Sequence, residues 1–146
     1  MLMFPLRRAP SRDQGESAGG QERASGVFRG TSVLVVEDDF IVAFDMQALL
    51  EERGARVLGP AASIAEAREL LSKERPTIAI LDVNLNGEYV FPLVADLRAQ
   101  RVPFLFATAY ADDERLFPEE ARTAPRLAKP VLPNVLIGQL LRLLRS

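Results

Sequence analysis

Short uninterrupted apolar runs alternate along this chain with longer segments in which apolar residues recur at helical spacing. The first run, Ser32–Val36, is typical of a strand buried on both faces of a parallel sheet. Further strand candidates follow at residues 55–58, 77–81, 102–107 and 127–128, and helical segments are expected at 40–53, from 64 up to Pro76, at 88–100 and at 133–144. This alternation predicts an α/β fold with a doubly wound, five-stranded parallel sheet.

Residues that favour helix ends indicate where the helices begin and end. Ser63 and Glu66 have the spacing of a capping box, and Pro133 suits a first helical position. Gly54 provides a C-terminal stop for the first helix. The expected buried face of that helix carries Val42, Met46, Leu49 and Arg53.

The segment 112–125 interrupts the alternation. It contains Pro118, Pro125 and five acidic residues, and it has little amphipathic pattern. We therefore expect a short or irregular fourth helix.

The length of 146 residues suits one domain, and 48% hydrophobic with 26% charged residues is typical of a globular protein. Residues 1–30 lack hydrophobic periodicity, so we expect a disordered N-terminal arm followed by one domain at residues 31–146. Five arginines against three acids give the arm a charge of +2, which leaves −4 for the remainder. An acidic domain lacks the basic surface of a nucleic-acid binder, so direct nucleic-acid binding is not expected.

The chain has no cysteine and no histidine. A Ser-His-Asp hydrolase, a histidine-ligated zinc site and a phosphohistidine donor are thereby excluded. The N-terminal Met1–Leu6 is interrupted by Pro5 and followed by arginines, the reverse of a secretory signal, and no apolar run has the length of a membrane span. We expect a cytoplasmic protein with no membrane partner.

Reactive side chains follow four of the five expected strands. Glu37, Asp38 and Asp39 come after the first strand, Asp82 after the third, Thr108 after the fourth and Lys129 after the fifth. Ligands of open α/β sheets bind outside the carboxyl ends of the strands, so these groups should converge. Clustered carboxylates without His or Cys favour Mg²⁺, with Ca²⁺ or Mn²⁺ as alternatives.

Lys129 and Thr108 suit the oxygens of a phosphoryl group in transfer, which leaves Asp82 as the nucleophile. Each of these residues also has a purely structural explanation. The acids after the first strand could stabilise a helix N-terminus, and Asp82 could be a turn residue. Thr108 could be a simple strand-end hydroxyl, and Lys129 a surface charge. Asp39 is as well explained as a simple N-cap. Because all these groups occur together, purely structural roles do not explain the whole set.

The chain resembles the response-regulator receiver family of two-component systems over Val33–Leu144. The resemblance rests on four motifs in order: Val35-Val36-Glu37-Asp38-Asp39, Leu81-Asp82-Val83-Asn84, Ala107-Thr108-Ala109 and Lys129-Pro130. It implies the flavodoxin-like receiver fold and a phosphorelay role. A segment including Phe106-Ala107-Thr108-Ala109-Tyr110 is similar to a single-domain subgroup with the motif Phe-Ala-Thr-Gly-Tyr, although alanine stands here for glycine.

The resemblance also implies a role for each site residue. Asp82 is the phosphoacceptor and a metal ligand, Asp38 a direct ligand, Glu37 a ligand through water, and the Asn84 backbone carbonyl a further ligand. Thr108 bonds the phosphoryl oxygen and shifts inward, and Lys129 pairs with the phosphate.

One position departs from the family pattern. Most receivers carry an aromatic residue three positions before the lysine, where this chain has Arg126. Tyr110 is therefore a candidate switch residue beside Thr108, although ordinary packing roles for Tyr110 and Arg126 explain them as well. The last helix is apolar over a wide arc, which favours a partner or homodimer surface or extra packing.

We expect a stand-alone receiver that takes phosphate from a sensor histidine kinase or histidine phosphotransfer protein. We expect no effector domain after Ser146, so that output would pass to a downstream protein partner or the chain would act as a phosphate sink. It would be no enzyme beyond promoting its own phosphorylation and dephosphorylation.

Two alternatives remain. One is a Mg²⁺-dependent aspartyl-phosphate phosphohydrolase, for which Asn84 stands where Asp is wanted. The other is a pseudo-receiver scaffold that is never phosphorylated.

Overall fold

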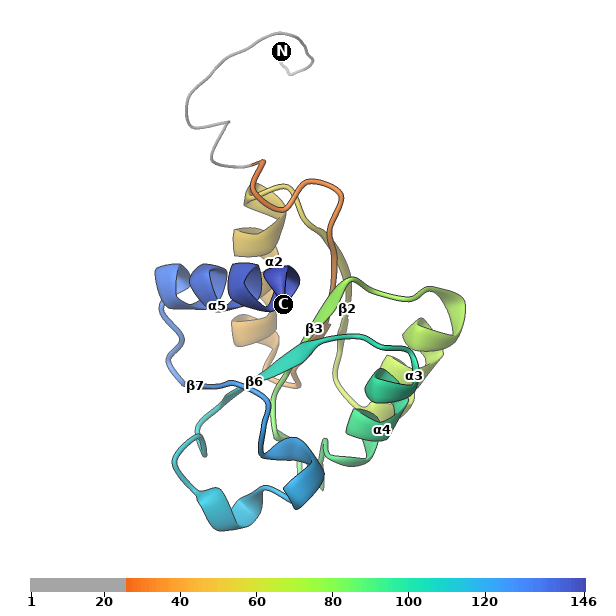
Figure 1. Cartoon of the computed structure of the whole chain (residues 1–146), viewed down its shortest axis with the longest axis vertical. Helices are drawn as coiled ribbons and strands as arrows, with labels where there is room; N and C mark the ends of the chain where they lie inside the picture. The colour runs from red at the N-terminus through yellow and green to blue at the C-terminus, as the bar shows by residue number, and fades with distance from the viewer. Residues whose placement is uncertain (1–25) are drawn as a thin grey trace, which may run out of the picture.

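A computed structural model describes residues 26–146 and consists of one parallel sheet covered by helices on both faces (Figure 1). The strand order is β2-β1-β3-β6-β7. The strands are β1 (Ser32–Val36), β2 (Arg56–Ala61), β3 (Ile78–Leu81), β6 (Phe104–Thr108) and β7 (Arg126–Ala128), and the helices are α2 (Phe40–Glu52), α3 (Ile64–Lys73), α4 (Pro92–Ala99) and α5 (Pro133–Arg145). The predicted five-stranded, doubly wound fold is confirmed.

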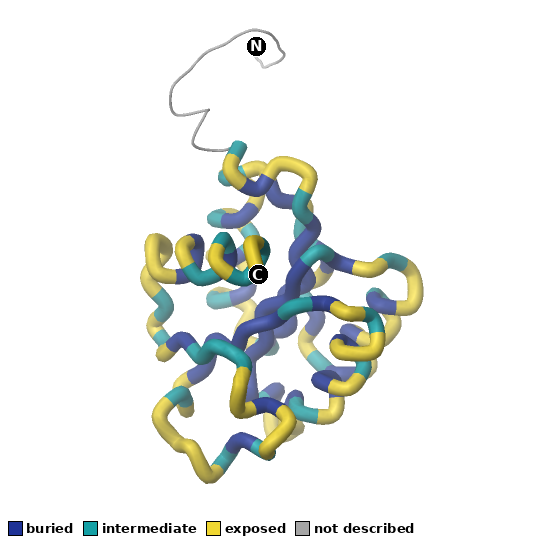
Figure 2. The backbone as a smooth tube through the Cα atoms, in the orientation of Figure 1, coloured by how far each residue is buried: buried dark blue, intermediate teal, exposed yellow. Residues whose placement is uncertain are grey.

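The three central strands are buried on both faces, as their uninterrupted apolar sequences predict. Alternate residues of β1 enter two separate cores: Leu34 and Val36 pack toward α3 and α4, and Val33 and Val35 pack toward α2 and α5. Figure 2 shows the buried strands in the middle of the molecule. The central strands therefore use the side chains of both faces for the core, and polar side chains occur only at the ends of these strands.

Helix α2 begins at the N-cap Asp39, whose carboxylate accepts hydrogen bonds from the backbone N–H groups of Ile41 and Val42. Its buried residues are Ala43, Met46 and Leu50, so the face predicted from Val42, Met46, Leu49 and Arg53 is wrong by part of a turn. Val42 and Leu49 are half-buried instead, because they line a groove between α2 and the chain that leads into α5. In α3 the Ser63 half of the capping box is confirmed, since Ser63 Oγ accepts from the Glu66 N–H at 3.1 Å. The Glu66 carboxylate accepts from the Ala62 N–H at 2.8 Å instead of from the Ser63 N–H.

The helix predicted at 88–100 is wrong in its first turn, because α4 begins only at Pro92. The residues before it form a small hairpin of β4 (Asn84–Leu85) and β5 (Glu88–Tyr89). Asn86 and Gly87 at its tip have φ values of +55° and +94°. A turn of this kind favours the sequence Asn-Gly. Glu88 and Tyr89 pair with the strand before the turn and are therefore not helical.

The irregular fourth helix is confirmed as two short 3-10 turns, η2 (Glu114–Leu116) and η3 (Glu119–Ala121). Pro118 separates them and lacks the N–H that a continuous helix would use. The segment between β6 and β7 is therefore held by tertiary contacts.

The apolar arc of α5 is mostly used for packing. Leu136, Ile137 and Leu140 are buried, while Val135 is exposed. A homodimer through this helix stays a prediction. In the described part of the chain, no helix is both long and apolar enough to cross a bilayer.

The fold begins before residue 31, so the expected boundary between arm and domain is too late. Phe28 is completely buried among residues of β1, α2 and α5, and its N–H donates to the Arg53 carbonyl oxygen at 2.8 Å. The predicted disorder of the arm otherwise concerns residues 1–25, which lie outside the described residues.

Candidate functional site

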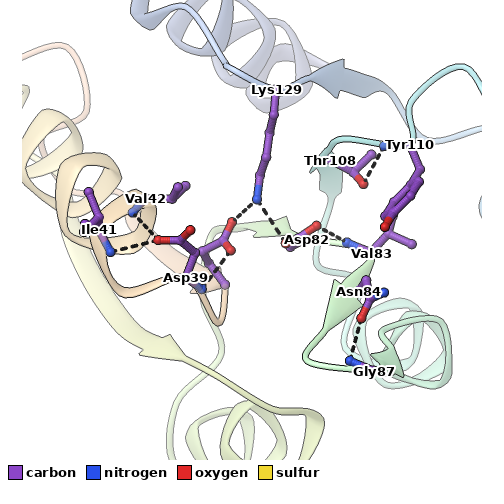
Figure 3. A network of polar contacts seen from close by, with 11 residues as sticks. Asp39, Ile41, Val42, Asp82, Val83, Asn84, Gly87, Thr108, Tyr110 and Lys129 are labelled. Atoms are coloured by element: carbon purple, nitrogen blue, oxygen red, sulfur yellow. Dashed lines mark hydrogen bonds and ion pairs between the residues drawn. The ribbon is translucent and has the colours of Figure 1, made fainter.

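The carboxyl ends of β1, β3, β6 and β7 bring the predicted site residues to one edge of the sheet. Val36 pairs with Leu81 in the β1–β3 register, and Thr108 pairs with Ala128 in the β6–β7 register. The acids after β1 therefore lie near Asp82, and Lys129 follows directly beside Thr108. Figure 3 shows Lys129 reaching across this edge towards Asp82.

Lys129 is the cationic centre of the site. Its Nζ donates to Glu37 Oε1 at 2.6 Å and to Asp82 Oδ2 at 3.0 Å. The remaining carboxylate oxygens are fixed by the backbone: the Val83 N–H donates to Asp82 Oδ1 at 2.7 Å, and the Asp39 N–H donates to Glu37 Oε2 at 3.1 Å. The Asp82 carboxylate is thus held in one orientation at a largely buried position.

Burial and pairing act in opposite directions on the ionisable groups of the site. Burial raises the pKa of Glu37 to about 6, although the hydrogen bond from Lys129 acts to lower it. Burial by itself would lower the pKa of Lys129, but the hydrogen bonds to Glu37 and Asp82 and the attraction of their charges together raise it. The ammonium is therefore charged at neutral pH.

The acids of the site suit a divalent cation. Carboxylate oxygens of Glu37, Asp38 and Asp82 all lie within 4.8 Å of one another. Three carboxylates around one ammonium leave an excess of negative charge in a largely buried position. Oxygen ligands of this kind fit Mg²⁺, Ca²⁺ or Mn²⁺.

The expected ligand role of the Asn84 carbonyl stays a prediction. The Asn84 side chain accepts a hydrogen bond from the Gly87 N–H at 2.7 Å, which stabilises the hairpin tip beside the acids.

An open cavity of about 350 Å³ gives access to the acids. It is lined by Asp38, Asp82, Asn84, Asn86, Gly87, Ala109, Tyr110 and Lys129. The cavity accordingly joins Asp38, Asp82, the Lys129 ammonium and the loop after β6.

Thr108 is fully buried at the end of β6. Its Oγ accepts a hydrogen bond from the Tyr110 N–H at 3.1 Å, so the hydroxyl is paired with its own loop. Tyr110 lines the same cavity as Asn84, and the residue is 44% exposed. The structure thus places Tyr110 in the cavity lining and buries Thr108, and the switch roles of both residues stay predictions.

Sequence reasoning assigned no partners to Arg126. Its guanidinium donates to Glu114 Oε1 at 2.7 Å and to the Ala111 carbonyl oxygen at 3.4 Å, and it lies 3.9 Å from the centre of the Phe117 ring. These partners come from the segment without regular pattern, so no sequence signal identifies them.

Five large exposed apolar side chains that are near the predicted site residues in the sequence were also missed. We call them together the rim surface: Phe40, Ile41 and Phe44 in α2, Leu132, and Val135 in α5. A groove of about 550 Å³ between α2 and the chain entering α5 has Lys129 among its lining residues, and none of the five lines it. The sequence could have indicated this exposure, because Phe40, Ile41 and Phe44 do not belong to the expected buried face of their helix.

Comparisons with known proteins agree with this geometry. The family model described as "Response regulator receiver domain" matches residues 33–140. The chain is 34% identical over 117 residues to the phyllosphere-induced regulator PhyR of Methylorubrum extorquens, across 78% of this chain and 43% of that protein. It is 29% identical over 102 residues to the transcriptional regulatory protein PdtaR of Mycobacterium tuberculosis, across 69% and 49%.

Solved structures give the same result. The response regulator PhyR from Brucella abortus superposes with a TM-score of 0.68 at 28% identity, over 79% of this chain and 48% of that one. SdrG from Sphingomonas melonis superposes with a TM-score of 0.68 at 32% identity, over 80% and 97%. The chain spans about half the length of the curated relatives it matches.

Proposed function

Since this chain belongs to the response regulator receiver domain family, which is matched over residues 33–140, we propose that Asp82 accepts a phosphoryl group from a phosphohistidine. The donor is a sensor histidine kinase or a histidine phosphotransfer protein. The observation that carries the proposal is the Lys129 ammonium, bonded to both Glu37 and Asp82 at the edge of an open cavity. Such a group neutralises charge where phosphoryl oxygens arrive.

The chain's own residues account for most of the transfer. A carboxylate oxygen of Asp82 forms a bond to phosphorus while the bond from phosphorus to the donor imidazole nitrogen breaks, and the imidazole leaves with the electron pair. Lys129 then pairs with a phosphoryl oxygen, and the Thr108 hydroxyl donates to another. A divalent cation held by Glu37, Asp38, Asp82 and the Asn84 carbonyl supplies further charge neutralisation when bound.

The rim surface supports a protein donor. Phe40 is 80% exposed and Ile41 is 70% exposed at the start of α2, and Leu132 is 62% exposed in the chain after Lys129. A group of large exposed apolar side chains typically marks a protein interaction site. Phe40 follows Asp38 by two residues and Leu132 follows Lys129 by three, so a protein bound there would present its phosphohistidine to Asp82.

For output, we propose contact with a downstream protein, or action as a phosphate sink, with Thr108 and Tyr110 as the residues that respond to phosphorylation. A relative from Bartonella quintana is described as the anti-anti-sigma factor PhyR, and this chain covers 52% of it. Its activity belongs to that longer protein, so the proposal here is limited to the receiver function.

Incubation with acetyl phosphate and Mg²⁺, followed by intact mass measurement, tests the proposal. We expect one added phosphoryl group in the wild type and none in Asp82→Asn. Wild type without added phosphoryl, or equal addition in both proteins, would contradict it. Sustained turnover of para-nitrophenyl phosphate would instead support the phosphohydrolase alternative.

A further inference from the structure

The side chain of Arg126 connects β7 to the irregular segment that begins beside the phosphoacceptor site. It is only 13% exposed, although it carries a charge and lies near the edge of the sheet. Its contacts with Glu114, the Ala111 carbonyl and the Phe117 ring define what we call the Arg126 clamp. Three contacts of different chemistry on one guanidinium fix its position more strongly than a single surface ion pair.

The clamp is anchored in the core. Phe117 is fully buried, and its ring lies edge-on to Phe106 at 5.2 Å and to Phe91 at 5.4 Å between ring centres. Phe106 is also the register partner of Arg126 across the β6–β7 pair. The guanidinium therefore covers an aromatic cluster that includes the strand residue two positions before Thr108.

A chain of hydrogen bonds connects the clamp to the site. The Tyr110 N–H donates to Thr108 Oγ at 3.1 Å, and the Tyr110 carbonyl oxygen accepts from the Asp113 N–H at 3.0 Å. The next residue, Glu114, is the ion-pair partner of Arg126. A displacement of Thr108 that carries the Tyr110 backbone with it therefore moves a segment that Arg126 holds.

Thr108 has to be displaced before it can contact a phosphoryl group. Among the described residues that line the cavity are Ala109 and Tyr110, but not Thr108, which is fully buried. We propose that Arg126 is a positioning residue of the phosphoacceptor site, which keeps the Thr108 hydroxyl paired with the Tyr110 amide and so opposes its movement toward a phosphoryl group on Asp82. This inference rests on the proposed phosphoacceptor function and adds its regulation.

The test compares the affinity of Mg²⁺-beryllofluoride, a mimic of a bound phosphoryl group, across variants. A contact that stabilises only the unoccupied arrangement weakens binding of the mimic, so removing the contact strengthens it. We expect Arg126→Ala to bind the mimic roughly three- to tenfold more tightly than wild type. Glu114→Gln should shift the affinity in the same direction by less, and Arg126→Lys should lie between wild type and Arg126→Ala.

Arg68→Ala is the matched control, since Arg68 pairs with Asp96 between α3 and α4 at 2.5 Å, away from the segment that the clamp holds. It should leave the affinity unchanged. A merely structural loss cannot produce tighter binding of the mimic. Glu114→Gln changes a side chain that is 68% exposed, so it provides the test even if Arg126→Ala does not fold.

Hydrogen exchange of the Tyr110 amide gives a second reading that needs no phosphate. The proposal predicts faster exchange in Arg126→Ala and Glu114→Gln than in wild type and Arg68→Ala. Unchanged exchange, or unchanged or weaker binding of the mimic by the clamp variants, would overturn the role of Arg126. If wild type did not bind the mimic, the result would count against the phosphoacceptor function instead. The exchange rate of the Tyr110 amide would then be the measurement that tests the positioning role of Arg126.

Discussion

Lys129 Nζ lies 3.0 Å from Asp82 Oδ2, although 47 residues separate the two in the sequence. The contact exists because β3 and β7 end at the same edge of the sheet, with β6 between them. Most of the proposed chemistry depends on this convergence of strand ends.

Replacement of Lys129 by methionine should destabilise the metal-free protein by about 1–3 kcal/mol, because Glu37 and Asp82 lose a shared buried partner. Added Mg²⁺ should restore part of the loss. Urea denaturation with and without Mg²⁺ measures both effects. The chain's other lysine, Lys73, is 71% exposed, so Lys73→Met is the matched control. Equal losses in the two variants would contradict the role given to Lys129.

Metal affinity should depend on pH through Glu37. The pKa of this carboxyl is raised by burial to about 6, and metal binding requires the ionised form, so protons compete with Mg²⁺ below that pH. Apparent affinity should fall by up to about tenfold per pH unit below about 6. In the metal-free protein, the pKa of Glu37 is about 6 in the folded state and 4.5 in the unfolded chain, so the folded state binds more protons between these pH values. The free energy of unfolding therefore decreases as the pH rises from about 4.5 to about 6.

Titration calorimetry across this range measures the effect on affinity, and Glu37→Gln serves as control. The control should bind Mg²⁺ with a weaker and flatter pH dependence. The same pH step in Glu37→Gln and in wild type would assign the step to another group.

Phe28 should be essential for stability even though it precedes the first strand. Its ring is fully buried, so Phe28→Ala should cost about 3–5 kcal/mol. Its neighbour Val27 is 44% exposed, and Val27→Ala should change the free energy of unfolding by no more than about 0.5 kcal/mol. Chemical denaturation distinguishes the two, and a small loss for Phe28→Ala would restore residue 31 as the start of the fold.

Two glycines should respond to alanine in opposite directions. Gly59 has a φ of +98°, and a Cβ there would lie 2.7 Å from the Ala61 nitrogen and 3.0 Å from the Val35 oxygen, so Gly59→Ala should destabilise by at least about 2 kcal/mol. Gly138 lies in α5 with open space around it, so Gly138→Ala should stabilise by about 0.5–1 kcal/mol. Thermal unfolding of both variants checks this, and changes of the same sign would be inconsistent with the structure.

The sequence was sufficient to predict the sheet and the residues at its edge. Short, fully apolar runs such as Val33–Val36, which alternate with helical segments, favour central parallel strands, and polar residues directly after such strands meet at one edge. This reasoning identified Glu37, Asp82 and Lys129 without knowledge of the strand order.

What could not be predicted depends on contacts between distant segments. The start of α4 at Pro92 follows from the hairpin of β4 and β5, whose two-residue strands are too short for a periodic pattern. The burial of Phe28 and the partners of Arg126 depend on tertiary packing around segments without regular structure. Asp39 was open to two interpretations, and its hydrogen bonds to two backbone N–H groups show that it is an N-cap.

The central claim is that the Asp82 carboxylate itself becomes an acyl phosphate. Borohydride reduces an aspartyl phosphate to homoserine, so protein treated with acetyl phosphate and Mg²⁺ can be reduced, digested and mapped by mass. We predict homoserine at position 82 and an unchanged aspartate at position 38. Homoserine at position 38, or at no position while phosphoryl mass is still gained, would contradict the assignment.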